Sequence, residues 1–389
     1  MNVLFMTHSF PRDAGDAAGS FILRLARGLA AEGVTVRVVA PSAQGLDPHA
    51  TLGGIAVDRF RYAPARYETL AYGGNMAEQV RDSWTAKLAL AGFLAGEWRA
   101  GREAIRSFAP DVVHAHWWFP NGVAAARVAR AARVPLVTTL HGTDVRMARS
   151  IAASRPAFRH VLGRSATVTA VSRWLAEEAN SLVPGTHPVV APMPVATELF
   201  HAGLADARTT NLLFVGRLMP QKGVDILLDA LVGLPPHVGL DVIGHGPDRE
   251  ALGVRAIALG VASRVRWHGA VRPDALEPFY QRAAALVVPS REEGLGLVAV
   301  EAQLCETPVI AFASGGLPDV IEHERTGILV PDRTAASLAR AINTFFARDD
   351  AGAALGAAGR VSALAAFSPE SVGRRYAEIY RNVASRNAH

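Results

Sequence analysis

Cysteine is almost absent from this chain of 389 residues, in which Cys305 is the only one. A single thiol excludes an internal disulfide and any zinc site built from cysteines, and it fits a reducing compartment. The surrounding sequence, EAQLCETPVI, is the apolar end of an expected helix. We therefore interpret Cys305 as a core thiol with no chemical role.

Signals for secretion and for membrane insertion are also missing. The N-terminal sequence MNVLFMTHSF has no basic region followed by a long apolar run. No window offers the roughly 20 uninterrupted apolar residues that a membrane-spanning helix needs. We therefore expect a soluble, cytoplasmic protein.

Runs of lysine and arginine are absent too, although the formal net charge is +5. The basic residues are mostly arginines scattered among alanines, without interleaved aromatic residues, so nucleic acid is not an expected partner. Weak attraction to an anionic membrane is left open, which would place the protein at the inner face of a membrane.

What the chain does have is a regular alternation of strand and helix patterns. Half of its residues are hydrophobic and 19% are charged, which is the composition of a folded protein. The sequence over 2–9 is β-rich, 21–33 is amphipathic at helical spacing, and 34–41 is β-rich again. Such alternation predicts an α/β protein with parallel sheets covered by helices on both faces.

The length suits two domains of similar size. The alternation lapses around 191–210, where proline, threonine and small residues take over. We predict doubly wound, Rossmann-like domains over 1–195 and 196–368, with a last helix, about 369–389, that packs back on the first domain. Two such sheets facing each other would form a ligand cleft at the carboxyl ends of their strands.

Charged residues stand at two strand-to-helix junctions in the second half of the chain. In NLLFVGRLMPQKGVDILLDAL, Arg217 follows the strand and Lys222 opens the helix. Two cations beside free helix amides make an anion site. The alternative is a surface turn with solubilising charges.

The second junction is ALVVPSREEGLGLVAVEAQLC. Gly294 and Gly296 let backbone amides approach a ligand closely. Glu293 has an alternative role as a simple helix cap, but Glu301 lies among apolar residues and needs donors, which vicinal sugar hydroxyls would supply. The two cations suit a diphosphate, Glu301 a ribose and Glu293 a second sugar, so the two junctions together indicate a nucleotide sugar.

These motifs, with DVIGHGPDREAL and TGILVPD, resemble the retaining glycosyltransferases of family 4, which have the GT-B fold. The Glu-x7-Glu pair of that family corresponds to Glu293 and Glu301. In the first half of the chain the resemblance rests on TTLHGTD and on the glycine loop after the first strand. Many relatives have Gly-Gly in that loop, whereas this chain has Ala18-Gly19.

The resemblance implies a hexosyltransferase that moves a sugar, with retention of configuration, from a nucleotide-diphosphate sugar to a hydroxyl acceptor. The acceptor would be a glycan, a polysaccharide precursor or a lipid-linked saccharide. The implied catalytic residues are His141, Arg217, Lys222 and Glu293. The implied donor-binding residues are Gly19, Arg217, Lys222, Gly294, Leu295, Gly296, Leu297 and Glu301.

Acceptor binding is expected in the first domain. The stretch HAHWWFPNG follows a strand, and His116 and Trp117, with Asp144 further along the chain, are the candidate acceptor residues. An aromatic plug beneath the cleft is the alternative for this stretch.

No cofactor is expected beyond the nucleotide sugar as co-substrate, and no metal is implied because the chain contains no Asp-x-Asp. Two other functions remain as alternatives. One is a nucleotide-sugar epimerase of the same architecture, and the other is a non-catalytic nucleotide-sugar binder. A dinucleotide oxidoreductase is disfavoured because no Gly-x-Gly-x-x-Gly follows the first strand.

Overall fold

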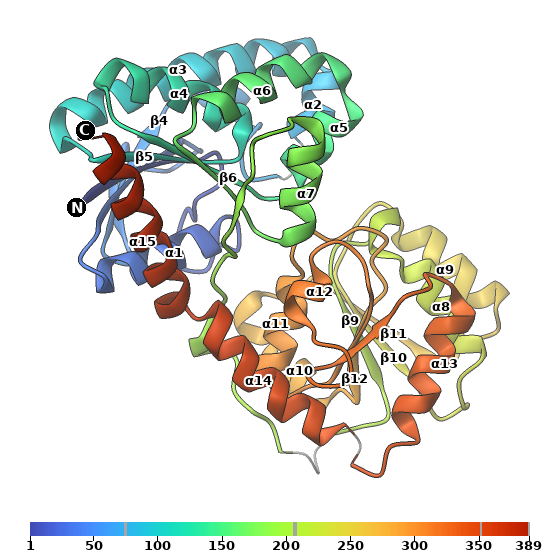
Figure 1. Cartoon of the computed structure of the whole chain (residues 1–389). Helices are drawn as coiled ribbons and strands as arrows, with labels where there is room; N and C mark the ends of the chain where they lie inside the picture. Colours follow the sequence, from blue (N-terminus) through green and yellow to red (C-terminus); the bar gives the residue numbers. More distant parts are fainter. Residues whose placement is uncertain (74–75, 205–207, 351, 388–389) are drawn as a thin grey trace. The chain divides into compact units, whose positions relative to one another are not determined.

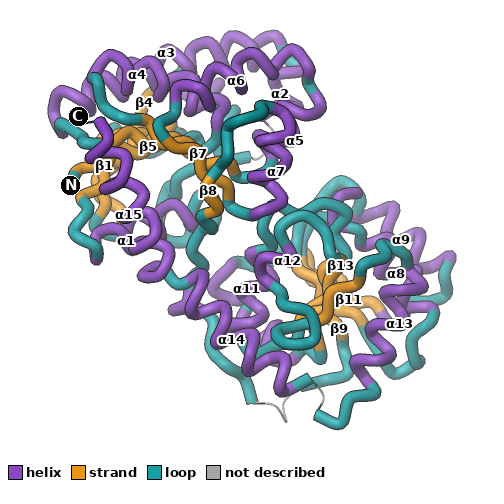
Figure 2. The backbone as a smooth tube through the Cα atoms, viewed as in Figure 1, coloured by secondary structure: helices purple, strands orange, loops and turns teal. Residues whose placement is uncertain are grey.

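The structure is a computed structural model that describes residues 1–73, 76–204, 208–350 and 352–387. It consists of two compact units, drawn in Figure 1. Unit 1 comprises Met1–Pro194 and the chain from Pro369 onward, and unit 2 comprises Val195–Ser368. Figure 2 shows the strands of each unit enclosed by helices. This confirms the prediction of an α/β protein whose sheets are covered by helices.

Unit 1 contains an eight-stranded sheet in the order β3-β4-β2-β1-β5-β6-β7-β8. The strands are Asn2–Met6 (β1), Thr35–Pro41 (β2), His49–Leu52 (β3), Ile55–Phe60 (β4), Val112–His116 (β5), Leu136–Leu140 (β6), Thr167–Ala170 (β7) and Val189–Val190 (β8). The strands pair in parallel, except that β3 and β4 are antiparallel. The chain extends to one side of β1 first and continues on the other side from β5. The topological switch point, where ligands bind in such sheets, therefore lies between β1 and β5.

Helices cover both faces of this sheet. They are Ser20–Ala31 (α1), Met76–Asp82 (α2), Trp84–Phe108 (α3), Val123–Ala132 (α4), Thr143–Ser150 (α5), Arg155–Arg164 (α6), Arg173–Leu182 (α7) and Pro369–Asn387 (α15). The side chains of Leu4 and Met6 in β1 pack with Phe93 of α3 and Val128 of α4 in one buried cluster. Among the described residues, no helix is long and apolar enough to span a lipid bilayer.

The helix α15 lies beside α1, as Figure 1 shows. A Cβ atom at Gly28 would lie 2.1 Å from the carbonyl oxygen of Pro369, and one at Gly373 would lie 2.5 Å from the carbonyl carbon of Gly28. The two backbones are therefore in direct contact, which larger residues would prevent. His114 Nδ1 and the Tyr380 hydroxyl, 2.7 Å apart, tie α15 to β5 as well. The helix was predicted over about 369–389, and residues 388–389 of that range lie outside the described part of the chain.

Unit 2 contains a parallel sheet in the order β11-β10-β9-β12-β13-β14. Its strands are Leu212–Val215 (β9), Leu240–Ile243 (β10), Val265–Gly269 (β11), Ala285–Val288 (β12), Val309–Phe312 (β13) and Ile328–Val330 (β14). Its helices are Val224–Val232 (α8), Arg249–Ala258 (α9), Glu277–Arg282 (α10), Leu297–Leu304 (α11), Leu317–Val320 (α12), Ala335–Phe346 (α13) and Ala353–Phe367 (α14). The switch point of this sheet lies between β9 and β12.

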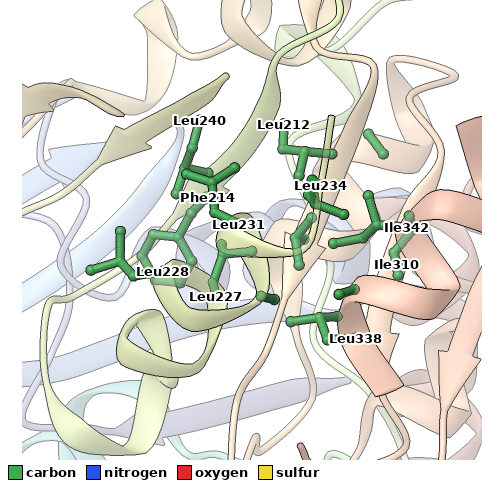
Figure 3. Packing of buried hydrophobic residues seen from close by; sticks show 14 of the residues in the cluster. Leu212, Phe214, Leu227, Leu228, Leu231, Leu234, Leu240, Ile310, Leu338 and Ile342 are labelled. Carbon is green, nitrogen blue, oxygen red and sulfur yellow. The ribbon is translucent and has the colours of Figure 1, made fainter. Parts of the chain in front are cut away.

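The core of unit 2 is apolar throughout. Figure 3 shows side chains from β9, β10 and β13 packed against α8 and α13, among them Phe214, Leu227 and Ile342. Burying one such side chain contributes about 1.5–3 kcal/mol, so this cluster holds the sheet and helices together. Cys305 is buried and unpaired, which confirms its interpretation as a core thiol.

Candidate functional site

The charged residues predicted in unit 2 lie on both sides of its switch point. Arg217 follows β9, and Lys222 ends the short 3-10 turn Pro220–Lys222 that leads into α8. Glu293 and the stretch 294–297 follow β12, and Leu297 begins α11. Because β9 and β12 are adjacent parallel strands, both loops emerge at the same edge of the sheet.

The loops at this edge are in close backbone contact. Gly223 has a φ of +68°, and a Cβ there would lie 2.0 Å from the carbonyl oxygen of Pro289. Gly315, after β13, has a φ of +56°, and its Cβ would lie 2.0 Å from the carbonyl oxygen of Glu293. The Gly316 amide donates to that same oxygen at 2.9 Å. Three consecutive loops of the sheet edge therefore hold one another in place.

The structure brings Lys222 and Glu293 into direct contact. Lys222 Nζ lies 2.6 Å from Glu293 Oε2, and the Ser290 hydroxyl donates to the same carboxylate oxygen at 3.2 Å. The two charged side chains are only 25% and 13% exposed. Arg217 is exposed and forms no ion pair within the described part of the chain. The site thus combines one neutralised cation with one whose charge is available to a ligand.

Glu301 on α11 is anchored by a residue that the sequence analysis did not single out. The hydroxyl of Tyr280, on α10, donates to Glu301 Oε2 at 2.8 Å. Burial, and then the neighbouring negative charge of Glu301, raise the pKa of Tyr280 well above its usual value. The hydroxyl therefore stays protonated and remains a donor that orients the carboxylate.

Arg291, the first residue of REEGLGL, also has a role that the sequence analysis missed. Its guanidinium group pairs with both carboxylate oxygens of Asp225 on α8, at 2.9 and 2.6 Å, and donates to the Pro220 carbonyl. Its backbone amide donates to the carbonyl of Gln221 at 2.8 Å. Arg291 thus fastens the loop after β12 to the turn that carries Lys222. The sequence gave no separate signal for this role, because Asp225 lies 66 residues before Arg291 and meets it only through the packing of the two junctions.

Gly294 to Gly296 lie in the loop before α11, which begins at Leu297. Gly296 has a φ of +97°, and a Cβ there would lie 2.7 Å from the side chain of Leu317. Only glycine adopts this left-handed conformation without strain while leaving the space free. The role of these amides in donor binding stays a prediction.

In unit 1, the structure brings His116, Trp117 and His141 together near the switch point. His116 Nδ1 and His141 Nε2 are 3.2 Å apart, and the ring centroids of Trp117 and His141 are 4.2 Å apart. Burial first, and then neighbouring histidine charges, lower the pKa of both His116 and His141 well below the usual value. Both imidazoles are therefore neutral at physiological pH, and they can exchange hydrogen bonds without carrying charge.

Asp144 holds the backbone of the loop after β6. Its Oδ1 accepts hydrogen bonds from the amides of His141, Gly142 and Val145, at 3.1, 2.9 and 3.0 Å. Burial raises the pKa of Asp144 to about 6 against the lowering effect of these amides. The carboxylate shapes the turn that carries His141, and its acceptor-binding role stays a prediction.

Gly19 precedes α1 in the loop that follows β1. It has a φ of +70°, and a Cβ there would lie 2.2 Å from the carbonyl oxygen of Ser9. The loop folds back on itself so closely that any side chain at Gly19 would displace it. Its predicted part in donor binding stays a prediction.

Three polar residues beside this loop, linked by hydrogen bonds, were missed by the sequence analysis. Asn121 Nδ2 donates to Glu97 Oε1 at 2.6 Å, and Asn121 Oδ1 lies 2.7 Å from His8 Nδ1. Burial raises the pKa of Glu97 to about 8 and lowers the pKa of His8 to about 4. The helical spacing that puts Glu97 on the same face of α3 as Phe93 was the available signal.

Two family models match complementary parts of the chain. Residues 196–361 match the model described as "Glycosyl transferases group 1", and residues 18–199 match "Glycosyltransferase Family 4". Among curated relatives, the D-inositol 3-phosphate glycosyltransferase of Streptomyces scabiei is 32% identical over 409 residues, covering 94% of this chain and 86% of its own length.

Solved structures share the fold. The sucrose-phosphate synthase of Thermosynechococcus elongatus has a TM-score of 0.79 at 23% identity, covering 99% of this chain and 100% of its own. The HepE protein of Anabaena, in complex with UDP and glucose, has a TM-score of 0.72 at 21% identity, covering 98% of this chain and 100% of its own. At these sequence identities, the structural similarity shows a shared fold only.

Proposed function

We propose a reaction from one premise: this chain belongs to the group 1 glycosyl transferases and is an enzyme of sugar transfer with the GT-B fold. The substrate that we propose for unit 2 is a nucleotide-diphosphate sugar. The observation that carries this proposal is the charge arrangement at the switch point between β9 and β12. Lys222 and Glu293 pair there at 2.6 Å, and Arg217, which follows β9, is exposed.

Each of these groups has a partner in the proposed substrate. Arg217 and Lys222 bind the diphosphate, assisted by backbone amides of 294–297. Glu301, oriented by Tyr280, accepts hydrogen bonds from the ribose hydroxyls. When Lys222 turns to the diphosphate, Glu293 becomes available to the hydroxyls of the donor sugar. The ion pair thus keeps both side chains in position until the donor arrives.

The two cations also serve the chemical step. As the bond between the sugar and the diphosphate breaks, its electron pair goes to the phosphate oxygen, and the growing negative charge is stabilised by Arg217 and Lys222. The acceptor hydroxyl forms the new glycosidic bond on the same face of the sugar, and its proton passes to a phosphate oxygen of the donor. We propose on this basis that configuration is retained and that transfer needs no metal ion. We also propose that His141 contacts the donor sugar.

The acceptor that we propose is a hydroxyl group of a saccharide, a polysaccharide precursor or a lipid-linked saccharide. His141, which is partly exposed and neutral, supports a site in unit 1 that binds hydroxyl groups, and the buried His116 and Trp117 pack against it. Peripheral contact with an anionic membrane, suggested by the net positive charge, is part of this proposal only for a lipid-linked acceptor.

Thermal-shift binding tests the donor. The wild-type protein is incubated with UDP, GDP and ADP and with their glucose, galactose and mannose conjugates, each with and without EDTA. We expect stabilisation by one nucleotide family, unchanged by EDTA. No stabilisation by any of them in a folded sample contradicts the nucleotide-sugar site, and a shift that EDTA removes contradicts metal independence. An inverted anomeric proton in the NMR spectrum of the product contradicts retention.

A further inference from the structure

The polar chain of Glu97, Asn121 and His8 fixes which nitrogen of His8 carries its proton. Asn121 donates its amide hydrogen to Glu97 Oε1 at 2.6 Å, so the amide oxygen of Asn121 faces His8. An amide oxygen only accepts hydrogen bonds, and His8 Nδ1 must therefore donate. In a neutral imidazole this leaves Nε2 unprotonated, with its lone pair as an acceptor.

The Nε2 atom of His8 is placed where a ligand is expected. His8 follows β1, at the switch point between β1 and β5. Its ring centroid lies 4.3 Å from that of Trp117, whose ring in turn lies 4.2 Å from His141. Nε2 makes no hydrogen bond with any described residue, so its acceptor capacity remains for a ligand.

Glu97, at the other end of this chain of hydrogen bonds, lowers the stability of the folded state. Glu97 is fully buried in unit 1, and its Oε2 has no hydrogen-bond partner within the described part of the protein. A buried carboxyl group with an unpaired oxygen costs free energy that an apolar side chain of similar size would avoid. The cost has a reason if the orientation of Asn121, and through it the tautomer of His8, matters for function.

We propose that His8 is an acceptor-binding residue, and that Asn121 and Glu97 are positioning residues that hold its tautomer. Nε2 of His8 accepts a hydrogen bond from a hydroxyl group of the acceptor next to the attacking one, whose own proton goes to the donor phosphate. The ligand class is a polyhydroxylated acceptor, a sugar or a cyclitol, whose ring packs beside Trp117. This inference rests on the proposed glycosyl transfer.

Three variants separate binding from positioning. His8→Phe keeps an aromatic ring beside Trp117 but removes the acceptor nitrogen. Glu97→Gln keeps a carbonyl oxygen for Asn121, whereas Glu97→Met removes it at similar volume. Glu103→Gln, on the exposed side of the same helix α3, controls for a lost charge.

The kinetic test uses UDP-, GDP- and ADP-glucose as donors, with D-inositol 3-phosphate and maltotriose as acceptor probes. We expect His8→Phe and Glu97→Met to raise the acceptor KM by about tenfold, the loss of one hydrogen bond, with the donor Kd within about twofold of wild type. Glu97→Gln and Glu103→Gln should stay close to wild type. Unchanged acceptor kinetics in His8→Phe, or an equal loss of donor affinity, overturns the proposal.

A second measurement is independent of substrate. In ¹⁵N-labelled protein, His8 should show a protonated Nδ1 and an unprotonated Nε2 in the wild type and in Glu97→Gln, and a mixture of tautomers in Glu97→Met. The opposite tautomer in the wild type overturns the positioning role. A wild-type enzyme that binds a donor but transfers to neither probe overturns the acceptor class. A wild type that binds none of the three donors refutes instead the underlying glycosyl transfer.

Discussion

The carboxyl group of Glu97 should make the stability of unit 1 depend on pH, and Glu97→Gln should remove that dependence. Burial raises the pKa of Glu97 from 4.5 to about 8 in the folded state, and the hydrogen bond from Asn121 only partly opposes this. Below both values the group is protonated in the folded and the unfolded chain, and its contribution to stability is fully present. Between them the unfolded chain releases the proton that the folded chain keeps, so the free energy of unfolding falls by about 1.4 kcal/mol per pH unit.

The contribution is therefore lost as the pH rises through about 8, and the total loss is on the order of 3–5 kcal/mol. Glutamine has no proton to release, and other titrating groups contribute equally to both proteins. The difference in free energy of unfolding between Glu97→Gln and the wild type isolates the single carboxyl group. Between roughly pH 5.5 and roughly pH 8.5, the free energy of unfolding of Glu97→Gln should rise by about 3 kcal/mol relative to that of the wild type.

Urea unfolding followed by tryptophan fluorescence measures this difference. Trp267 is the one tryptophan of the six that belongs to unit 2, so the signal reports mainly on unit 1 and reduces the ambiguity of a protein with two units. Glu103→Gln on the same helix should follow the wild type at every pH. Parallel stability curves for wild type and Glu97→Gln would refute a strongly buried, protonated carboxyl group at this position.

Other predictions concern the donor site and the packing of α15. Arg217→Ala should lower turnover by on the order of 10²–10³ with an unchanged melting temperature, and equal turnover would exclude it from leaving-group stabilisation. Glu301→Ala should weaken nucleotide binding, measured by calorimetry, by about 1.5–3 kcal/mol. Tyr280→Phe removes only the hydroxyl that orients Glu301 and should weaken binding by less. A larger effect of Tyr280→Phe would contradict the assignment of Glu301 as the residue that contacts the nucleotide. Gly373→Ala should lower the urea midpoint of unit 1 by an amount equivalent to about 1–3 kcal/mol, because its Cβ would meet the backbone of Gly28. An unchanged midpoint would mean that the two helices are not in backbone contact.

The sheets could be predicted because their central strands are buried on both faces and read as continuous apolar runs. Val309–Phe312 and Ala285–Val288 are buried at every position, and each is followed by a helix. The antiparallel strand β3, His49–Leu52, gave no such signal. Three of its four residues are exposed, and its pairing with β4 depends on the turn between them rather than on an apolar face.

The site could be predicted only as far as residue type and chain position determine it. The sequence placed Lys222 and Glu293 at two strand-to-helix junctions, and the structure shows that the two strands are neighbours and that the two charged groups lie 2.6 Å apart. It could not show that they pair with each other, because the pairing depends on how two loops pack. The role of Tyr280 could not be predicted for the same reason. Its hydroxyl meets Glu301 only because α10 and α11 are neighbours in space.

The two switch points differ in charge, and that difference argues for a division of labour. The switch point of unit 2 carries Arg217, Lys222 and Glu293, groups suited to an anionic nucleotide and its sugar. The switch point of unit 1 carries histidines whose pKa values are lowered by burial, among them His8 and His141, beside an aromatic ring. Neutral imidazoles next to an apolar ring bind hydroxyl groups better than they bind phosphates, because they form hydrogen bonds without offering charge. On the proposed function, the charge of the reaction would be handled in unit 2, and unit 1 would bind a substrate recognised by its hydroxyl groups.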